Sequence, residues 1–121
     1  MTRAFTCLGA GTDLDAAYRS AVAEGGPVAS TTAVREIDVP PGANPSKLGT
    51  WVQRVAQDPA AAADVPEDHR GAVEKEAVGL LADPATCLAI RLEGEVAERT
   101  KARAGAAAGD RAYLLFGLAE A

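Results

Sequence analysis

The side chains best suited to hold a charged ligand lie in the C-terminal third of the chain. Arg99, Lys101 and Arg103 occupy alternate positions, and Arg111 follows at the end of the same segment. Guanidinium groups bind carboxylates and phosphates through paired, charge-assisted hydrogen bonds. We therefore expect these four residues to contact an anionic ligand or a protein partner.

Covalent chemistry would require a cysteine beside a base, and the chain offers Cys7, Cys87 and a single histidine, His69. Such a pair must come within hydrogen-bond distance, whereas a cysteine in an apolar strand is usually a small core residue. A metal site built on one histidine would need cysteine or carboxylate ligands, and no helical spacing typical of such a site occurs in the sequence. We expect no catalytic residue, no metal and no cofactor, and the function leans away from catalysis.

A glycine pair near the N-terminus, Gly9 and Gly11, is placed between an expected strand and an expected helix. This spacing resembles the start of a dinucleotide-binding loop, where backbone amides at a helix N-terminus hold phosphate. However, Leu14 stands where the third glycine would be, and Asp13 and Asp15 would repel a pyrophosphate. The pair therefore predicts a tight strand-to-helix turn.

The overall charge limits the classes of partner. The 121 residues carry a net charge of -5, which makes nucleic acid and anionic membrane unlikely partners because binding to phosphates needs clustered Lys and Arg. The length fits one domain over residues 1–121. Two cysteines do not make the disulfide framework of a small secreted protein, and the apolar runs are too short for a signal peptide or a membrane span. We expect a cytoplasmic protein.

Hydrophobic periodicity predicts the elements that must position these residues. Strands are expected over residues 3–8, 31–39, 86–93 and 111–119, and helices over residues 13–24, 45–57 and 64–82. Thr12 is the expected cap of the first helix, and Asn44 with Pro45 is expected to start the second. The order β-α-β-α-α-β-β predicts an α+β fold with a mainly antiparallel four-stranded sheet and helices on one face. Residues 94–110, rich in Ala and Gly, are expected to form a flexible loop.

The last strand predicts that both faces of the sheet are covered. Leu114 and Phe116 fall on one face of this strand, whereas Tyr113 and Leu115 fall on the other. Because the expected helices cover only one face, the second face needs another cover. We therefore expect a homodimer through a face formed by Ala89, Tyr113 and Leu115.

Part of the chain resembles small uncharacterised α+β proteins of actinobacteria and phages. The resemblance lies in Leu81-Ala-Asp-Pro-Ala-Thr-Cys-Leu-Ala-Ile-Arg-Leu, the variable basic stretch that follows, and Tyr113-Leu-Leu-Phe-Gly-Leu-Ala. It also extends to the first strand and helix. It implies a strand, a loop and a final strand, and it implies no activity.

Two hypotheses for the function follow. The first is a non-catalytic interaction module that contacts a protein or an anionic ligand through the sheet face and residues 94–110. The alternative is a small-molecule-binding protein or enzyme built on a dimeric α+β sheet, with a pocket between sheet and helices. The aromatic residues expected to line that pocket are Phe5, Trp51, Tyr113 and Phe116. A buried Arg35 or Arg91 in a cleft would favour the alternative.

Overall fold

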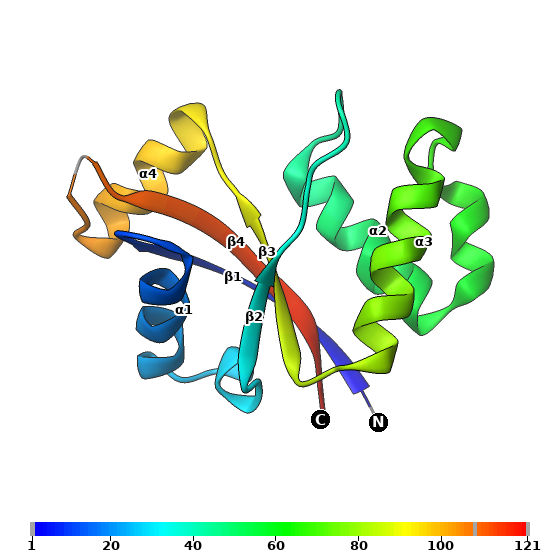
Figure 1. Ribbon diagram of the computed structural model, residues 1–121, viewed down its shortest axis with the longest axis horizontal. Helices are drawn as coiled ribbons and strands as arrows, with labels where there is room; N and C mark the ends of the chain where they lie inside the picture. The colour runs from blue at the N-terminus through cyan, green and yellow to red at the C-terminus, as the bar shows by residue number, and fades with distance from the viewer. Residues whose placement is uncertain (1, 108, 121) are drawn as a thin grey trace.

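The computed structural model describes residues 2–107 and 109–120, and within them the chain forms an α+β fold around one open sheet (Figure 1). The strands are β1 (Thr2–Gly11), β2 (Ala33–Glu36), β3 (Thr86–Arg91) and β4 (Arg111–Glu120). The α-helices are α1 (Leu14–Ala23), α2 (Pro45–Gln57), α3 (Glu67–Ala82) and α4 (Gly94–Ala104). Two short 3-10 helices, η1 (Pro27–Ser30) and η2 (Pro59–Asp64), complete the fold.

The sheet is mixed, so the expectation of a mainly antiparallel sheet is wrong. The strand order is β1-β4-β3-β2, in which β4 runs antiparallel to both of its neighbours and β2 runs parallel to β3. The connection from β2 to β3 contains α2, η2 and α3. A connection that carries helices brings the chain back to the starting edge, so the next strand runs in the same direction.

Helices cover both faces of the sheet, which corrects the expectation of helices on one face only. On one face, α2 and α3 pack against β3 and β4, whereas α1 and η1 pack on the other face (Figure 1). The first cluster includes Leu114 and Phe116, and the second includes Tyr113 and Leu115. The alternation along β4 therefore separates two hydrophobic cores, as expected for a central strand covered on both sides.

The residues expected to form a dimer face are buried inside one chain. Tyr113 is 1% exposed, and Ala89 and Leu115 are 0% exposed. Their cover is α1, which contributes Ala17 and Tyr18 to the same cluster. The expected open face is therefore wrong, because the first helix folds back over it and removes the need for a second copy there.

Two glycines of β1 allow α1 to pack closely on the strand. A Cβ on Gly9 would lie 2.9 Å from the carbonyl oxygen of Ala17, and a Cβ on Gly11 would lie 2.8 Å from its nitrogen. Carbon atoms do not approach backbone atoms so closely, so only glycine fits at these positions. Gly9 and Gly11 thus serve helix-strand packing and not phosphate binding.

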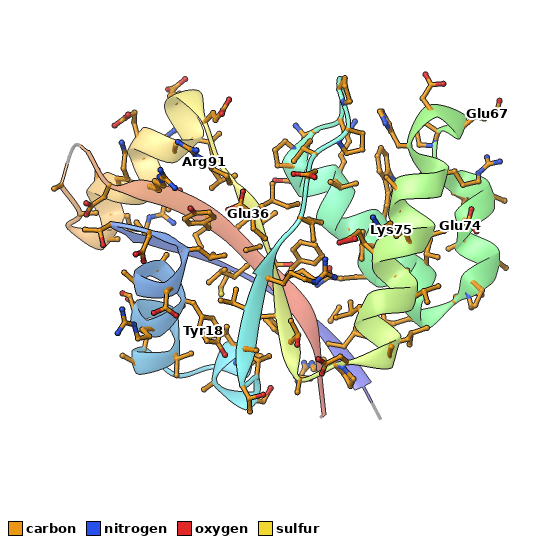
Figure 2. The ribbon with its side chains drawn as sticks, in the orientation of Figure 1. Tyr18, Glu36, Glu67, Glu74, Lys75 and Arg91 are labelled. Carbon is orange, nitrogen blue, oxygen red and sulfur yellow. The ribbon has the colours of Figure 1, made fainter. Side chains whose placement is uncertain are left out.

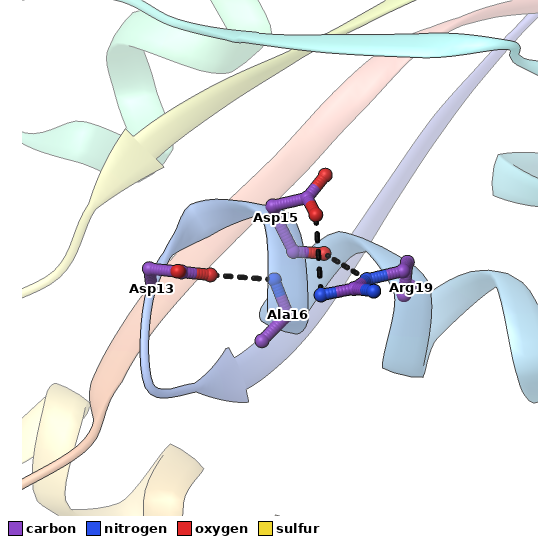
Figure 3. A network of polar contacts seen from close by, with 4 residues as sticks. All are labelled: Asp13, Asp15, Ala16 and Arg19. Atoms are coloured by element: carbon purple, nitrogen blue, oxygen red, sulfur yellow. Dashed lines mark hydrogen bonds and ion pairs between the residues drawn. The ribbon is translucent and has the colours of Figure 1, made fainter.

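The N-terminus of α1 is capped by Asp13 and not by Thr12 as expected (Figure 3). The Oδ1 atom of Asp13 accepts a hydrogen bond from the backbone nitrogen of Ala16 at 2.8 Å. Asp15 in the first turn forms an ion pair with Arg19, four residues further along the helix, at 3.2 Å. A carboxylate thus already occupies the position in which an anion would bind.

The start of α2 is confirmed, and α2 is tied to the sheet by a buried glutamine. Asn44 caps the helix, and Pro45 is its first residue. The Nε2 atom of Gln53 donates to the carbonyl oxygens of Phe5 at 2.6 Å and Gly117 at 3.2 Å. These two residues are opposite each other in the pairing of β1 with β4, so α2 is anchored at that pair.

The segment expected to be a flexible loop contains α4, so the expected element order lacks one helix. Gly94 is the first residue of the helix, with φ 70°, and Gly105 ends the helix with φ 70° in the left-handed region. The amide of Ala106 donates to the carbonyl of Lys101 at 2.9 Å, and that of Gly105 donates to Ala102 at 3.2 Å. This pair of bonds is the Schellman ending of a helix. Glycine therefore delimits a helix here, where its abundance predicted disorder.

Candidate functional site

The four basic residues expected to act together do not all lie at one place, because three of them are on two different sides of α4 and the fourth is on β4. Arg99 and Arg103, four positions apart, are exposed on the same side of the helix. Lys101 is only 8% exposed, and its Nζ atom lies 3.0 Å from a carboxylate oxygen of Glu98. Arg111 is exposed at the start of β4, outside the hollow beside Arg99. The structure thus brings together Arg99 and Arg103.

These two arginines flank exposed apolar side chains. Arg99 and Arg103 line a hollow of about 170 Å³ together with Leu8 of β1 and with Val96 and Thr100 of α4. Leu8 is 40% exposed and Val96 is 49% exposed. Arginine is enriched in protein interfaces, and exposed apolar side chains beside it gain free energy when a partner buries them.

The hollow continues along β1 towards α1. A second hollow, of about 100 Å³, shares Leu8 and Arg103 with the first and adds Glu24, and a third, of about 150 Å³, shares Leu8 and Glu24. We call the three together the β1 groove. Its α4 side is lined by Val96, Arg99, Thr100 and Arg103, its α1 side by Phe5, Ala21, Glu24 and Val28, and Leu8 lies between them.

The two sides of the β1 groove differ in charge. On the α4 side, a guanidinium nitrogen of Arg99 lies 3.7 Å from Glu95, and both side chains are strongly exposed. Such a surface pair contributes little, so Arg99 remains able to bind another carboxylate. Among the described residues, Arg103 has no ion-pair partner. On the α1 side, Glu24 provides a negative charge.

The thiols are poorly suited to nucleophilic chemistry. Burial raises the pKa of Cys87 to about 12. Burial, and to a smaller extent the nearby charge of Glu24, also raises the pKa of Cys7. The thiolate is the nucleophilic form, so both side chains stay protonated at neutral pH.

The pair of Cys87 and His69 that nucleophilic chemistry would need is not formed. The His69 ring stacks on Trp51, with 6.0 Å between ring centroids, and Trp51 packs against the core on the α2 and α3 side of the sheet. Cys87 belongs to the core on the α1 side. The sheet therefore separates the thiol from the imidazole.

The aromatic pocket of the alternative hypothesis is also not formed, because its residues belong to opposite faces of the sheet. Phe5 and Tyr113 pack with α1, whereas Phe116 packs with α2 and α3, and Trp51 lies against the same core as Phe116. Arg35 is not buried in a cleft either, since its side chain is 48% exposed and lies 3.2 Å from Glu76.

A larger hollow lies where the parallel strands β2 and β3 end. Its volume is about 540 Å³, and its charged lining consists of Glu36, Asp38, Arg91 and Glu93. Glu36 and Arg91 are labelled at this end of the strands in Figure 2. In open sheets with parallel strands, ligands bind at the carboxyl ends of the strands. The sequence signal that could have found it is the pair of charged residues at the end of each strand, Glu36 with Asp38 and Arg91 with Glu93.

Comparison with known proteins finds no matching family model, no matching curated protein and no matching solved structure.

Within residues 2–107 and 109–120, no set of three or more His, Cys, Asp or Glu side chains is arranged to hold a metal ion. None of the helices in this part of the chain has the length and apolar character that a membrane crossing requires.

Proposed function

We propose that this chain is a non-catalytic binding module whose contact surface is the β1 groove and whose partner is an acidic segment of a protein. One observation carries the proposal: the exposed Leu8 and Val96 line the same hollow as Arg99 and Arg103. The apolar side chains gain free energy when a partner buries them, and the two guanidinium groups select for carboxylates. Both contributions act at one place.

The net negative charge of the chain does not oppose this assignment, because the charge is unevenly distributed. The helix α4 carries three basic and two acidic side chains, whereas α3 carries four acidic side chains and two basic ones. Charges separated by more than about 10 Å are largely screened at about 0.1 M salt. The local charge of the groove therefore governs contact, and the acidic remainder disfavours binding elsewhere.

The proposal is tested with three eight-residue peptides that contain four valines each. The first alternates Val and Glu, the second has the same composition with the four Glu in one block, and the third alternates Val and Lys. We expect both acidic peptides to bind at least about tenfold more tightly than the lysine peptide, a difference of about 1.4 kcal/mol. Fluorescence anisotropy at low and physiological salt measures the dissociation constants.

Charge reversal then locates the site. Arg99→Glu combined with Arg103→Glu should weaken binding of both acidic peptides by at least about tenfold, because two charge-assisted contacts become repulsive. The control, Arg54→Glu combined with Lys75→Glu, changes the net charge of the chain by the same amount as the first double variant. Its substitutions lie on α2 and α3, away from the groove, so it should have little effect. Equal losses in the two double variants, or failure of both acidic peptides to bind the unaltered chain, would contradict the proposed function.

A second candidate function is favoured by the hollow at the ends of β2 and β3. Three carboxylates and one guanidinium line this hollow, which suits a small polar molecule with an amino group. Titration with small amines and amino acids would support this function if the amide NMR signals of Glu36, Arg91 and Glu93 moved while that of Leu8 did not. Unchanged spectra at millimolar ligand would remove it.

A further inference from the structure

The backbone hydrogen bonds show which groups of β4 face each neighbour. The amide of Leu92 donates to the carbonyl of Ala112 at 2.9 Å, so even-numbered residues of β4 turn their backbone groups towards the β3 side. In an extended strand, successive residues turn these groups to opposite edges. The odd-numbered residues of β4, including Gly117, therefore turn theirs towards β1.

The same alternation identifies the groups of β1 that lie on its outer edge. Gly117 is opposite Phe5 in the register, and the Nε2 atom of Gln53 reaches both of their carbonyl oxygens. Both carbonyls thus lie between the two strands, which makes this a hydrogen-bonded pair. The neighbouring residues Ala4, Thr6 and Leu8 consequently turn their N–H and C=O groups away from β4, towards the free edge.

This edge is accessible and lacks the usual protection. Among the described residues, no strand lies beyond β1 in the sheet, and Ala4, Thr6 and Leu8 are all exposed. Protein edges are normally protected by short strands, proline or charged side chains. By contrast, β1 has 10 residues, contains no proline and has Arg3 as its one charged residue.

The β1 groove differs between the two faces of the sheet along this edge. Side chains of Thr6 and Leu8 point to the α4 side of the sheet, and those of Phe5 and Cys7 point to the α1 side. An added strand would alternate in the same way. Its side chains opposite Thr6 and Leu8 would meet the arginines of α4, and the others would enter the hollow on the α1 side.

We propose that the acidic partner segment binds in extended form as a fifth strand, antiparallel to β1, with acidic residues opposite Thr6 and Leu8 and apolar residues between them. This inference rests on the proposed function and specifies the conformation and sequence pattern of the partner. Acidic side chains then face Arg99 and Arg103, and apolar side chains enter the hollow on the α1 side, which Glu24 lines without a basic residue. Antiparallel pairing matches the pairing of β1 with β4 and is slightly more stable per residue.

A second copy of the chain fits this edge less well. The β1 strand of a second copy offers no acidic residue to Arg99 or Arg103, because its single charged side chain is Arg3. Charge complementarity therefore favours an acidic strand over self-pairing. Sedimentation that shows a dimer which the alternating Val/Glu peptide does not dissociate would overturn the assignment of the edge.

Strand addition is tested on the unaltered chain by blocking backbone amides of the peptide on the edge that faces β1 or on the edge that faces solvent. In an antiparallel strand with Glu opposite Thr6 and Leu8, the glutamate amides face β1 and the valine amides face solvent. N-methylation of two central Glu residues should therefore weaken binding of the alternating peptide by at least tenfold. N-methylation of two central Val residues should change it by less than about threefold. Equal binding of both methylated peptides, or loss with the valine-methylated peptide alone, would overturn the proposal.

The corresponding change in the protein is Thr6→Pro. Proline removes the amide at the free edge and breaks no bond to β4, which is the position in a sheet where proline is tolerated. Circular dichroism and thermal unfolding check the fold, and the alternating peptide should bind the folded variant at least tenfold more weakly. Unchanged affinity would count against strand addition, and if the variant did not fold, the methylated peptides would still decide.

The outcomes separate this inference from the proposed function. If the alternating and block acidic peptides bind equally and both depend on Arg99 and Arg103, the binding function stands and strand addition is wrong. If neither acidic peptide binds, the function itself is wrong. Strand addition predicts that the alternating peptide binds at least tenfold more tightly than the block peptide.

Discussion

Leu8 is the residue on which the β1 groove depends most. It lines all three hollows of the groove and keeps 40% of its surface exposed. Full burial of a leucine side chain is worth about 1.5–3 kcal/mol, so a partner that completes its burial gains part of this energy. Arg99 and Arg103 add selectivity for carboxylates, and Glu24 disfavours an acidic side chain on the opposite side.

The sequence predicted the charge of this site better than its geometry. Arg99 and Arg103 could be named from their type, because exposed guanidinium groups are suited to anions. The separation of Lys101 could not be foreseen without the helix, since helical spacing turns it away from its two neighbours. The exposure of Leu8 was not predicted, because a single apolar residue in a strand is usually assigned to the core until the position of α4 is known.

A prediction at this scale concerns the buried thiol of Cys87. Burial raises its pKa from 9.0 to about 12, so above pH 9 the unfolded chain loses this proton while the folded chain retains it. The free energy of unfolding should therefore fall with rising pH between about 9 and 12, by up to about 1.4 kcal/mol per pH unit, and should not change below that range on account of this group.

Guanidinium unfolding of the wild type and of Cys87→Ala, from about pH 8 to about pH 10.5, measures this slope. Cys87→Ala should show the smaller fall, because the two proteins differ only in the buried thiol. Parallel stability curves would show that Cys87 ionises alike in the folded and unfolded states.

At the scale of elements, β1 and α1 form a closely packed unit. Gly9 and Gly11 leave room for the backbone of Ala17, and Asp13 starts the helix directly after the strand. This unit places α1 over one face of the sheet and leaves the outer edge of β1 open between α1 and α4. The packing that creates the core therefore also creates the groove.

Gly11→Ala tests this packing. The new methyl group would lie 2.8 Å from the nitrogen of Ala17, so the helix must shift and the free energy of unfolding should fall by about 1–3 kcal/mol. Gly71→Ala in α3 is the matched control, because a Cβ there meets no atom within 4 Å. That variant should gain about 0.5–1 kcal/mol from helix propensity. Denaturant unfolding compares the two, and equal effects would disprove close packing at Gly11.

Element prediction failed mainly at α4. Residues that favour helix, such as Glu95, Ala97 and Lys101, fill the segment, and Gly105 is a typical helix end. The Gly and Ala content obscured this signal, because glycine was read as flexibility and not as a helix boundary. Strong capping signals succeeded elsewhere, as with Asn44 and Pro45 at the start of α2.

At the scale of the whole molecule, the sheet is a central layer with α1 on one face and α2 and α3 on the other (Figure 1). Alternation in β4 correctly predicted that Tyr113 and Leu115 need cover. It could not predict what covers them, because that depends on the side to which the β1-α1 connection returns. The parallel pairing of β2 with β3 likewise depends on the path of the connection, which local periodicity does not encode.

The most direct measurement of the central claim is amide NMR of the unaltered chain during titration with the alternating Val/Glu peptide. Binding in the β1 groove predicts saturable signal changes at Ala4, Thr6 and Leu8 and along α4 from Val96 to Arg103, with slowed hydrogen exchange at Thr6 and Leu8. Changes confined to Glu36 and Arg91, or no change at millimolar peptide, would contradict the account.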